Sequence, residues 1–264
     1  MAIITRITLS LIIALLIALP PAHAGEAAAY PAPAQDRAFL YAVDWGPAPL
    51  ATIEVSMTRD GDLTRLVGRS RPSGLLSMLS DFDLTQTSDY GPEGPRLFVS
   101  HGEFDGQVTA RRVTFAPGTD PVSEVLIESG EPRPRTPIPD GALAEAVDPL
   151  FPILEAMRAI AGGLGCSGDH RVYTGRSAFR MVLTDKGDET LTADRSWTFG
   201  GPARRCGIGI ERIGGFPVEK GRWDMNEADI SRDIWFADLP GGIAPVRLSV
   251  EWPLGYATGR IDLR

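Results

Sequence analysis

The chain has 264 residues, a formal net charge of −8 and a hydrophobic content of 43%. This length suits one large β domain or two small ones, and the apolar fraction is sufficient for a buried core. The acidic balance, with no Lys/Arg run longer than two residues, argues against nucleic acid and anionic lipid surfaces as partners, because both are negatively charged.

The first 24 residues have the order of a secretory signal peptide. Arg6 precedes a 13-residue apolar run from Ile7 to Leu19, and helix-breaking prolines lead to the small-x-small site that ends at Ala24. Roughly 20 apolar residues are needed to cross a bilayer as a helix, so the run is too short for an anchor. A lipoprotein would need Cys where this chain has Gly25. We predict cleavage after Ala24, a periplasmic or secreted location, and no stable membrane insertion after cleavage.

The remaining chain is predicted to form one β-rich domain over residues 38–264. Residues 25–37 precede it as an Ala/Pro-rich segment, which is typical of a flexible tail. A Pro-rich stretch from Glu131 to Pro139 predicts an extended surface connector. The domain could therefore consist of two half-sheets, divided near residues 130–147, that share one barrel-like core.

The dominant pattern along this domain has a period of two, as in Ile53, Val55 and Met57, which alternate with polar neighbours. Such alternation is typical of antiparallel strands with one buried face. Turn signals recur between the runs and predict hairpin connections, as at Asp60-Gly61-Asp62, Asp105-Gly106 and Lys186-Gly187-Asp188. The predicted fold class is mainly β, a large curved antiparallel sheet, barrel-like or half-barrel, with one short helix packed on it. Strands are expected near 38–45, 50–59, 63–71, 82–90, 95–103, 106–116, 121–129, 170–175, 177–185, 204–213, 229–238, 244–251 and 254–263.

One segment has a helical period instead. The apolar stripe consists of Leu150, Ile153, Leu154, Met157 and Ile160. This spacing places the stripe on one face of a helix over about 149–161, with Asp148 as its expected cap and Gly162-Gly163 as its stop. If the helix packs on the concave face of the sheet, the stripe forms one wall of an apolar groove.

The two cysteines, Cys166 and Cys206, are predicted to form a disulfide. An even number of cysteines in an exported protein favours pairing. A zinc site is the competing use, but two cysteines and scattered histidines do not supply four ligands.

No motif assigns a catalytic, cofactor-binding or metal-binding residue. His101 and His170 have no metal-ligand spacing, and we interpret both as ordinary solvated residues at a strand end and in a loop. No nucleophile elbow is present. Asp81 and Asp83 flank Phe82, so they would share one face of a strand, and without a cleft around them they are solvated charges.

Several stretches, taken in order, resemble the exported bacterial family catalogued as domain of unknown function 3108. The resemblance rests on Leu40–Gly46, Ser73–Leu76, Asp148–Leu150, Cys166, Val172–Arg176, Cys206, Pro245–Leu248 and Pro253–Gly255. It covers roughly residues 38–264 and implies an exported, mostly antiparallel β protein with paired cysteines. The family has no assigned activity, so the resemblance implies no catalytic residue.

Two functions from different classes fit these features. The first is a non-enzymatic periplasmic binding or envelope-assembly protein whose groove takes an apolar small molecule or an envelope component. The alternative is an envelope hydrolase that acts on glycan or peptide through paired carboxylates, which requires an acidic cleft. No cofactor is expected in either case.

The signal peptide generates the first testable prediction. Expression in the native compartment should yield a mature protein that begins at Gly25, because Ala22-His23-Ala24 is the well-placed cleavage site after the apolar run. Intact mass and N-terminal sequencing measure this directly. Soluble protein that retains Met1 would contradict the prediction.

Overall fold

The computed structural model describes residues 36–264 apart from 79, 105, 131–133, 219–229 and 254. The predicted signal peptide and almost all of the predicted tail lie outside these residues. The described chain is built on a 13-stranded sheet in which every neighbouring pair is antiparallel. The expected fold class, a large antiparallel sheet with one helix packed on it, is therefore confirmed.

The two halves of the chain form consecutive parts of this sheet. The first half contains β1 (Arg37–Trp45), β2 (Ala48–Asp60), β3 (Leu63–Pro72), the 3-10 helix η1 (Gly74–Met78), β4 (Phe82–Gly91), β5 (Gly94–Phe104), β6 (Gln107–Thr114) and β7 (Val122–Glu128). The second contains α2 (Phe151–Ala161), β8 (Gly168–Tyr173), β9 (Ala178–Leu191), β10 (Gly201–Gly214), β11 (Ser231–Leu239), β12 (Gly242–Trp252) and β13 (Gly255–Asp262).

The strand order is β7-β6-β5-β4-β3-β2-β1-β13-β12-β11-β10-β9-β8, so the first and last strands meet at the centre of the sheet. The pairing of β1 with β13 runs from Leu40 opposite Asp262 to Trp45 opposite Ala257. The edge strands β7 and β8 do not pair with each other, and the sheet is not closed. Of the two forms predicted, the open half-barrel is the one adopted.

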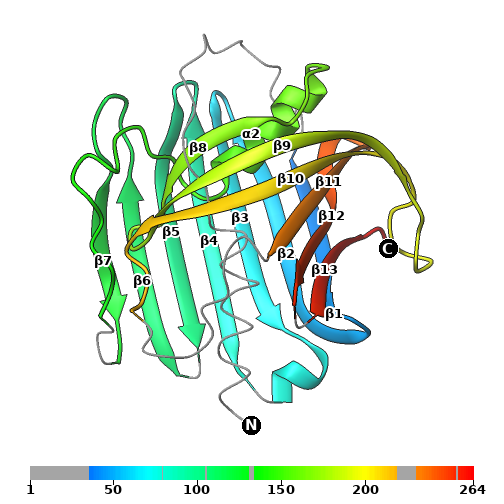
Figure 1. Cartoon of the computed structure of the whole chain (residues 1–264), viewed down its shortest axis with the longest axis horizontal. Helices are drawn as coiled ribbons and strands as arrows, with labels where there is room; N and C mark the ends of the chain where they lie inside the picture. The colour runs from blue at the N-terminus through cyan, green and yellow to red at the C-terminus, as the bar shows by residue number, and fades with distance from the viewer. Residues whose placement is uncertain (1–35, 79, 105, 131–133, 219–229, 254) are drawn as a thin grey trace.

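The sheet curls until its two ends overlap. Figure 1 shows β9 and β10 passing across the face of strands β3–β5. Side chains from the two ends pack against each other in one core cluster. It contains Phe98 of β5 and Val113 of β6 from one end, and Tyr173 of β8 and Ala178 of β9 from the other. The curl gives the sheet an inner face that can be packed without a second sheet.

Helix α2 lies on this inner face. Its Leu154 is 1% exposed and belongs to a cluster with Met57 of β2, Phe179 of β9 and Ile234 of β11. The helix begins at Phe151 with Pro152 in its first turn, where a missing N–H is tolerated, and ends before Gly162. Its start differs from the predicted one by two residues, and Pro149 lies outside the helix.

Strand β9 continues through a position that was predicted to be a turn. Lys186-Gly187-Asp188 is not a hairpin connection, because β9 continues to Leu191. Cys206 pairs with Asp185 and Arg204 pairs with Asp188, so two residues of β9 oppose one residue of β10. This is a β-bulge, and Gly187 fits it because its φ of 86° is costly for other residues.

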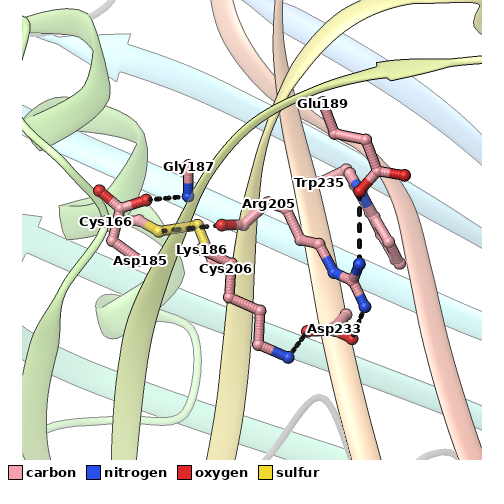
Figure 2. Close-up of polar contacts among 9 residues, drawn as sticks. All are labelled: Cys166, Asp185, Lys186, Gly187, Glu189, Arg205, Cys206, Asp233 and Trp235. Carbon is pink, nitrogen blue, oxygen red and sulfur yellow. Dashed lines mark hydrogen bonds and ion pairs between the residues drawn. A yellow bond between two sulfur atoms is a disulfide. The ribbon is translucent and has the colours of Figure 1, made fainter.

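The disulfide between Cys166 and Cys206 joins the segment after α2 to β10 (Figure 2). Both cysteines are buried, with exposed fractions of 1% and 0%. Because Cys166 follows the helix closely, the disulfide fixes the C-terminal end of α2 against the sheet.

An ion-pair network lies beside the disulfide (Figure 2). Asp233 accepts hydrogen bonds from Lys186 Nζ at 2.6 Å and from Arg205 Nη2 at 2.7 Å. Glu189 Oε2 accepts from the indole N–H of Trp235 at 3.0 Å, and the Arg205 guanidinium lies over the Trp235 ring. These residues lie on β9, β10 and β11, so the network holds the bulged strand to its neighbours.

The packing of α2 generates the second testable prediction. Leu154→Ala should lower the free energy of unfolding by about 2–5 kcal/mol, because truncating a fully buried leucine loses transfer energy and leaves a void. Leu164→Ala is the matched control, since Leu164 is 55% exposed and should change stability by less than about 0.5 kcal/mol. Urea denaturation of both variants tests the prediction. Equal effects would show that α2 is not held by this stripe.

Candidate functional site

A cavity of about 130 Å³ lies between helix α2 and the inner face of the sheet. Strands β1–β4 form one part of its lining, β11–β13 form another, and α2 with its preceding residue Leu150 forms the rest. The two halves of the chain thus contribute opposite parts of the lining, and the β1–β13 pair joins them. The cavity exists only because the sheet is continuous and curled.

The lining is mostly aliphatic and aromatic. Arg247 is the one charged residue in it, and its guanidinium is engaged with the backbone carbonyl of Thr192 at 3.1 Å. The Tyr41 hydroxyl donates to the Pro245 carbonyl at 2.9 Å, and burial raises the pKa of Tyr41 above its usual range. The described lining therefore offers an apolar ligand many contacts, and Arg247 is its one charged group.

Four of the five residues predicted as a groove wall line this cavity: Leu150, Ile153, Leu154 and Met157. The fifth, Ile160, is not among the lining residues and packs, half-buried, against the core beside Met157. Its position near the end of α2 explains the difference, because the helix extends beyond the cavity there.

Asp148 was predicted to cap helix α2, but its side chain instead connects the segment before the helix to the sheet. Its Oδ1 accepts hydrogen bonds from Ser88 Oγ at 2.8 Å, the Tyr90 hydroxyl at 2.9 Å and the Leu150 N–H at 2.9 Å. The helix itself starts after Leu150, which has no side-chain cap. The carboxylate therefore joins the beginning of α2 to β4.

The environment of Asp148 disfavours its charge. The residue is 0% exposed, and its Oδ2 has no hydrogen-bond partner within the described chain. Burial raises the pKa of Asp148 to about 6, although the hydrogen bonds from Leu150, Ser88 and Tyr90 oppose the rise. No periodicity argument identifies such an acceptor, because its donors lie about 60 residues earlier in the chain.

His170 is not the solvated loop residue that the sequence suggested. It lies in β8, and its Nδ1 is 3.3 Å from Glu155 Oε2 of α2. Burial lowers the pKa of His170 to about 4, so the imidazole is neutral at pH 7, and burial also raises the pKa of Glu155. Neither residue lines the cavity, so the pair contributes to the contact of α2 with β8.

The other sequence candidates lie apart from the cavity. Asp83 is paired with Arg69 and Arg71 on the neighbouring strand β3, and His101 is exposed on β5. Asp81 is exposed and precedes β4. None of these residues lines the cavity, and the part of the lining that the structure describes contains no Asp or Glu.

Among the described residues, no group of three or more His, Cys, Asp or Glu side chains is arranged to hold a metal ion. In the same part of the chain, no helix combines the length and apolar character needed to span a membrane.

These features define a class: an open, barrel-like antiparallel β protein with an apolar cavity between its sheet and helix α2. The chain matches the family described as protein of unknown function (DUF3108) over residues 40–262, and it belongs to that family. The resemblance drawn from its motifs is thereby confirmed. No match is found among curated proteins.

A solved structure shares the fold. It is the crystal structure of a beta-barrel-like protein of domain of unknown function DUF1849 from Brucella abortus. The similarity has a TM-score of 0.52 and 10% sequence identity, and it covers 88% of this chain and 97% of that chain. At this identity the likeness concerns the fold alone.

The raised pKa of Asp148 generates the third prediction. Since the native state holds this proton more tightly than the unfolded chain, the contribution of Asp148 to stability should increase as the pH falls from about 6 to about 4. Asp148→Asn removes this titration. We expect the unfolding free energy of the wild type, relative to the variant, to rise as the pH is lowered through that window. Urea denaturation at pH 7, 6, 5 and 4 measures the difference, and a constant difference would contradict the prediction.

Proposed function

We propose that the protein is an exported, non-enzymatic binding or envelope-assembly protein whose cavity holds a lipid-like or other apolar small molecule. The proposal rests on one observation: the structure contains an apolar cavity that a larger side chain at a lining position could have filled. A cavity with mostly apolar walls and few polar groups is typical of small-molecule sites. The predicted signal peptide supports the same view, because a periplasmic protein meets lipids and lipid-linked envelope components.

Gly68 supports the view that the open space serves binding. Gly68 lies in β3 between Leu66 and Ser70 on the inner face, and all three line the cavity. A Cβ atom at Gly68 would meet nothing within 4 Å, and the backbone there is not in the left-handed region. A larger side chain would therefore fit, and glycine inside a strand lowers stability. The chain leaves open a space that a single substitution would fill.

The hydrolase alternative lacks a comparable observation. It requires two carboxylates across a cleft, and no Asp or Glu is found among the described lining residues. The described carboxyl groups with raised pKa are Asp148 and Glu155, which have different partners and lie outside the cavity lining.

The fourth prediction tests the proposal with N-phenyl-1-naphthylamine, a neutral apolar dye whose fluorescence rises in apolar surroundings. The wild type should bind the dye. An apolar ligand with a ten-carbon chain, such as 1-decanol, should displace the dye and raise the melting temperature of the protein by mass action. Gly68→Leu should raise the Kd of the dye at least about tenfold, because the new side chain occupies the cavity, and should leave the melting temperature equal or higher.

Val67→Leu is the matched control, because Val67 is next to Gly68 on β3 but points to the opposite face of the sheet. It should bind the dye like the wild type. If the wild type does not bind the dye or any C10 ligand, or if Gly68→Leu and Val67→Leu bind equally well, the proposal is wrong.

A further inference from the structure

The inner face of β4 carries three polar residues at alternate positions, Gln86, Ser88 and Tyr90. Ser88 and Tyr90 donate to the buried carboxylate of Asp148. Gln86 has no such partner. Its side chain is 6% exposed and lines the cavity, and it makes no hydrogen bond within the described chain.

Ser70 on β3 is likewise a buried polar residue of the cavity lining. It is 5% exposed, lines the cavity, and its hydroxyl has no hydrogen-bond partner among the described residues. Leaving a buried amide or hydroxyl unpaired is costly, and native proteins normally avoid it. Neither the Gln86 amide nor the Ser70 hydroxyl is among the fully enclosed unpaired polar atoms of the described chain, so both groups reach the open space of the cavity and can take a partner from outside the chain.

The strand register places these two groups around one point. Gly68 lies directly opposite Gln86, and Ser70 lies opposite Leu84, so Ser70 and Gln86 are diagonal neighbours on the inner face. Side chains in that relation are about 7–8 Å apart at their Cα atoms, which allows both to reach one small group between them. The missing side chain of Gly68 leaves this space open.

We propose that Gln86 and Ser70 form a subsite over Gly68 for the uncharged polar head of an amphipathic ligand, such as an acyl amide, an ester or a fatty alcohol. This inference rests on the proposed function, since it assigns the chemistry of the ligand that the cavity holds. The Gln86 amide offers both a donor and an acceptor, and so does the Ser70 hydroxyl. An ester carbonyl, an amide or a hydroxyl satisfies such groups.

The same geometry disfavours a charged head. A buried carboxylate needs a cation or several donors. The one charged residue of the described lining, Arg247, lies on β12, and three strands separate β12 from β3 in the sheet order. The free energy needed to desolvate a fatty acid anion would therefore exceed the free energy of its hydrogen bonds to Gln86 and Ser70. The ligand class is accordingly the neutral acyl derivative rather than the free fatty acid at neutral pH.

The test compares four ligands with a ten-carbon skeleton at pH 7.5: decanamide, 1-decanol, decanoate and n-decane. Each displaces N-phenyl-1-naphthylamine from the wild type and from Gln86→Met, which keeps the length of the side chain but removes its amide. We expect the wild type to prefer decanamide and decanol over decane, and decanoate to bind most weakly. Gln86→Met should weaken decanamide about 3- to 10-fold, the value of one hydrogen bond, and should not weaken decane, because methionine keeps the wall apolar.

Adding Ser70→Ala to Gln86→Met should remove the remaining preference for decanamide over decane. Val67→Leu, whose side chain points to the opposite face of the sheet, is the control and should keep the wild-type order of the four ligands. If the wild type binds decane and decanamide equally, prefers decanoate, or loses both neutral ligands in parallel upon Gln86→Met, the subsite is refuted while the proposed function stands. If the wild type binds none of the four ligands and no dye, the proposed function fails as well.

Discussion

The pairing of β1 with β13 is the constraint on which the rest of the structure depends. These strands come from opposite ends of the domain, and without their six paired positions the sheet would be two separate halves. Buried Asp44 strengthens the junction, because its carboxylate accepts from Arg260 Nη1 at 3.0 Å and is paired with Arg195 at 2.8 Å. Since loop closure over more than 200 residues is costly in entropy, this junction needs both backbone pairing and charge.

The continuous sheet then determines where the helix lies. A strongly twisted sheet of this width cannot remain flat, and its right-handed twist brings β8 and β9 over β5 and β6. The helix fills most of the space enclosed by this curl. It is fixed at its beginning by Asp148 and beyond its end by the disulfide of Cys166. A wall held at both ends can border a cavity without collapsing into it.

Much of this fold and the helical wall of the cavity follow from local pattern, whereas the polar groups of the site do not. The alternation of Ile53, Val55 and Met57 requires a strand, and the stripe through Leu154 requires a helix, because both depend on near neighbours in the chain. The turn predicted at Lys186-Gly187 was wrong for a related reason. A glycine with positive φ fits a β-bulge as well as a turn, and only the pairing with the neighbouring strand distinguishes the two. The Asp148 acceptor and the Gln86–Ser70 pair depend on register across strands, which the sequence pattern does not specify.

The inward positions of β4 contain a signal that sequence reasoning could have used. Phe82, Leu84, Gln86, Ser88 and Tyr90 alternate as a buried series, yet the last three are polar. A polar residue on a buried face must find a partner, so the series already implies acceptors elsewhere. Asp148 supplies one acceptor for two of the residues, and the third faces the unfilled space over Gly68. A chain selected only for stability would place an apolar side chain at Gln86 and a larger residue at Gly68, and the ligand site that we propose would account for the stability that both positions forgo.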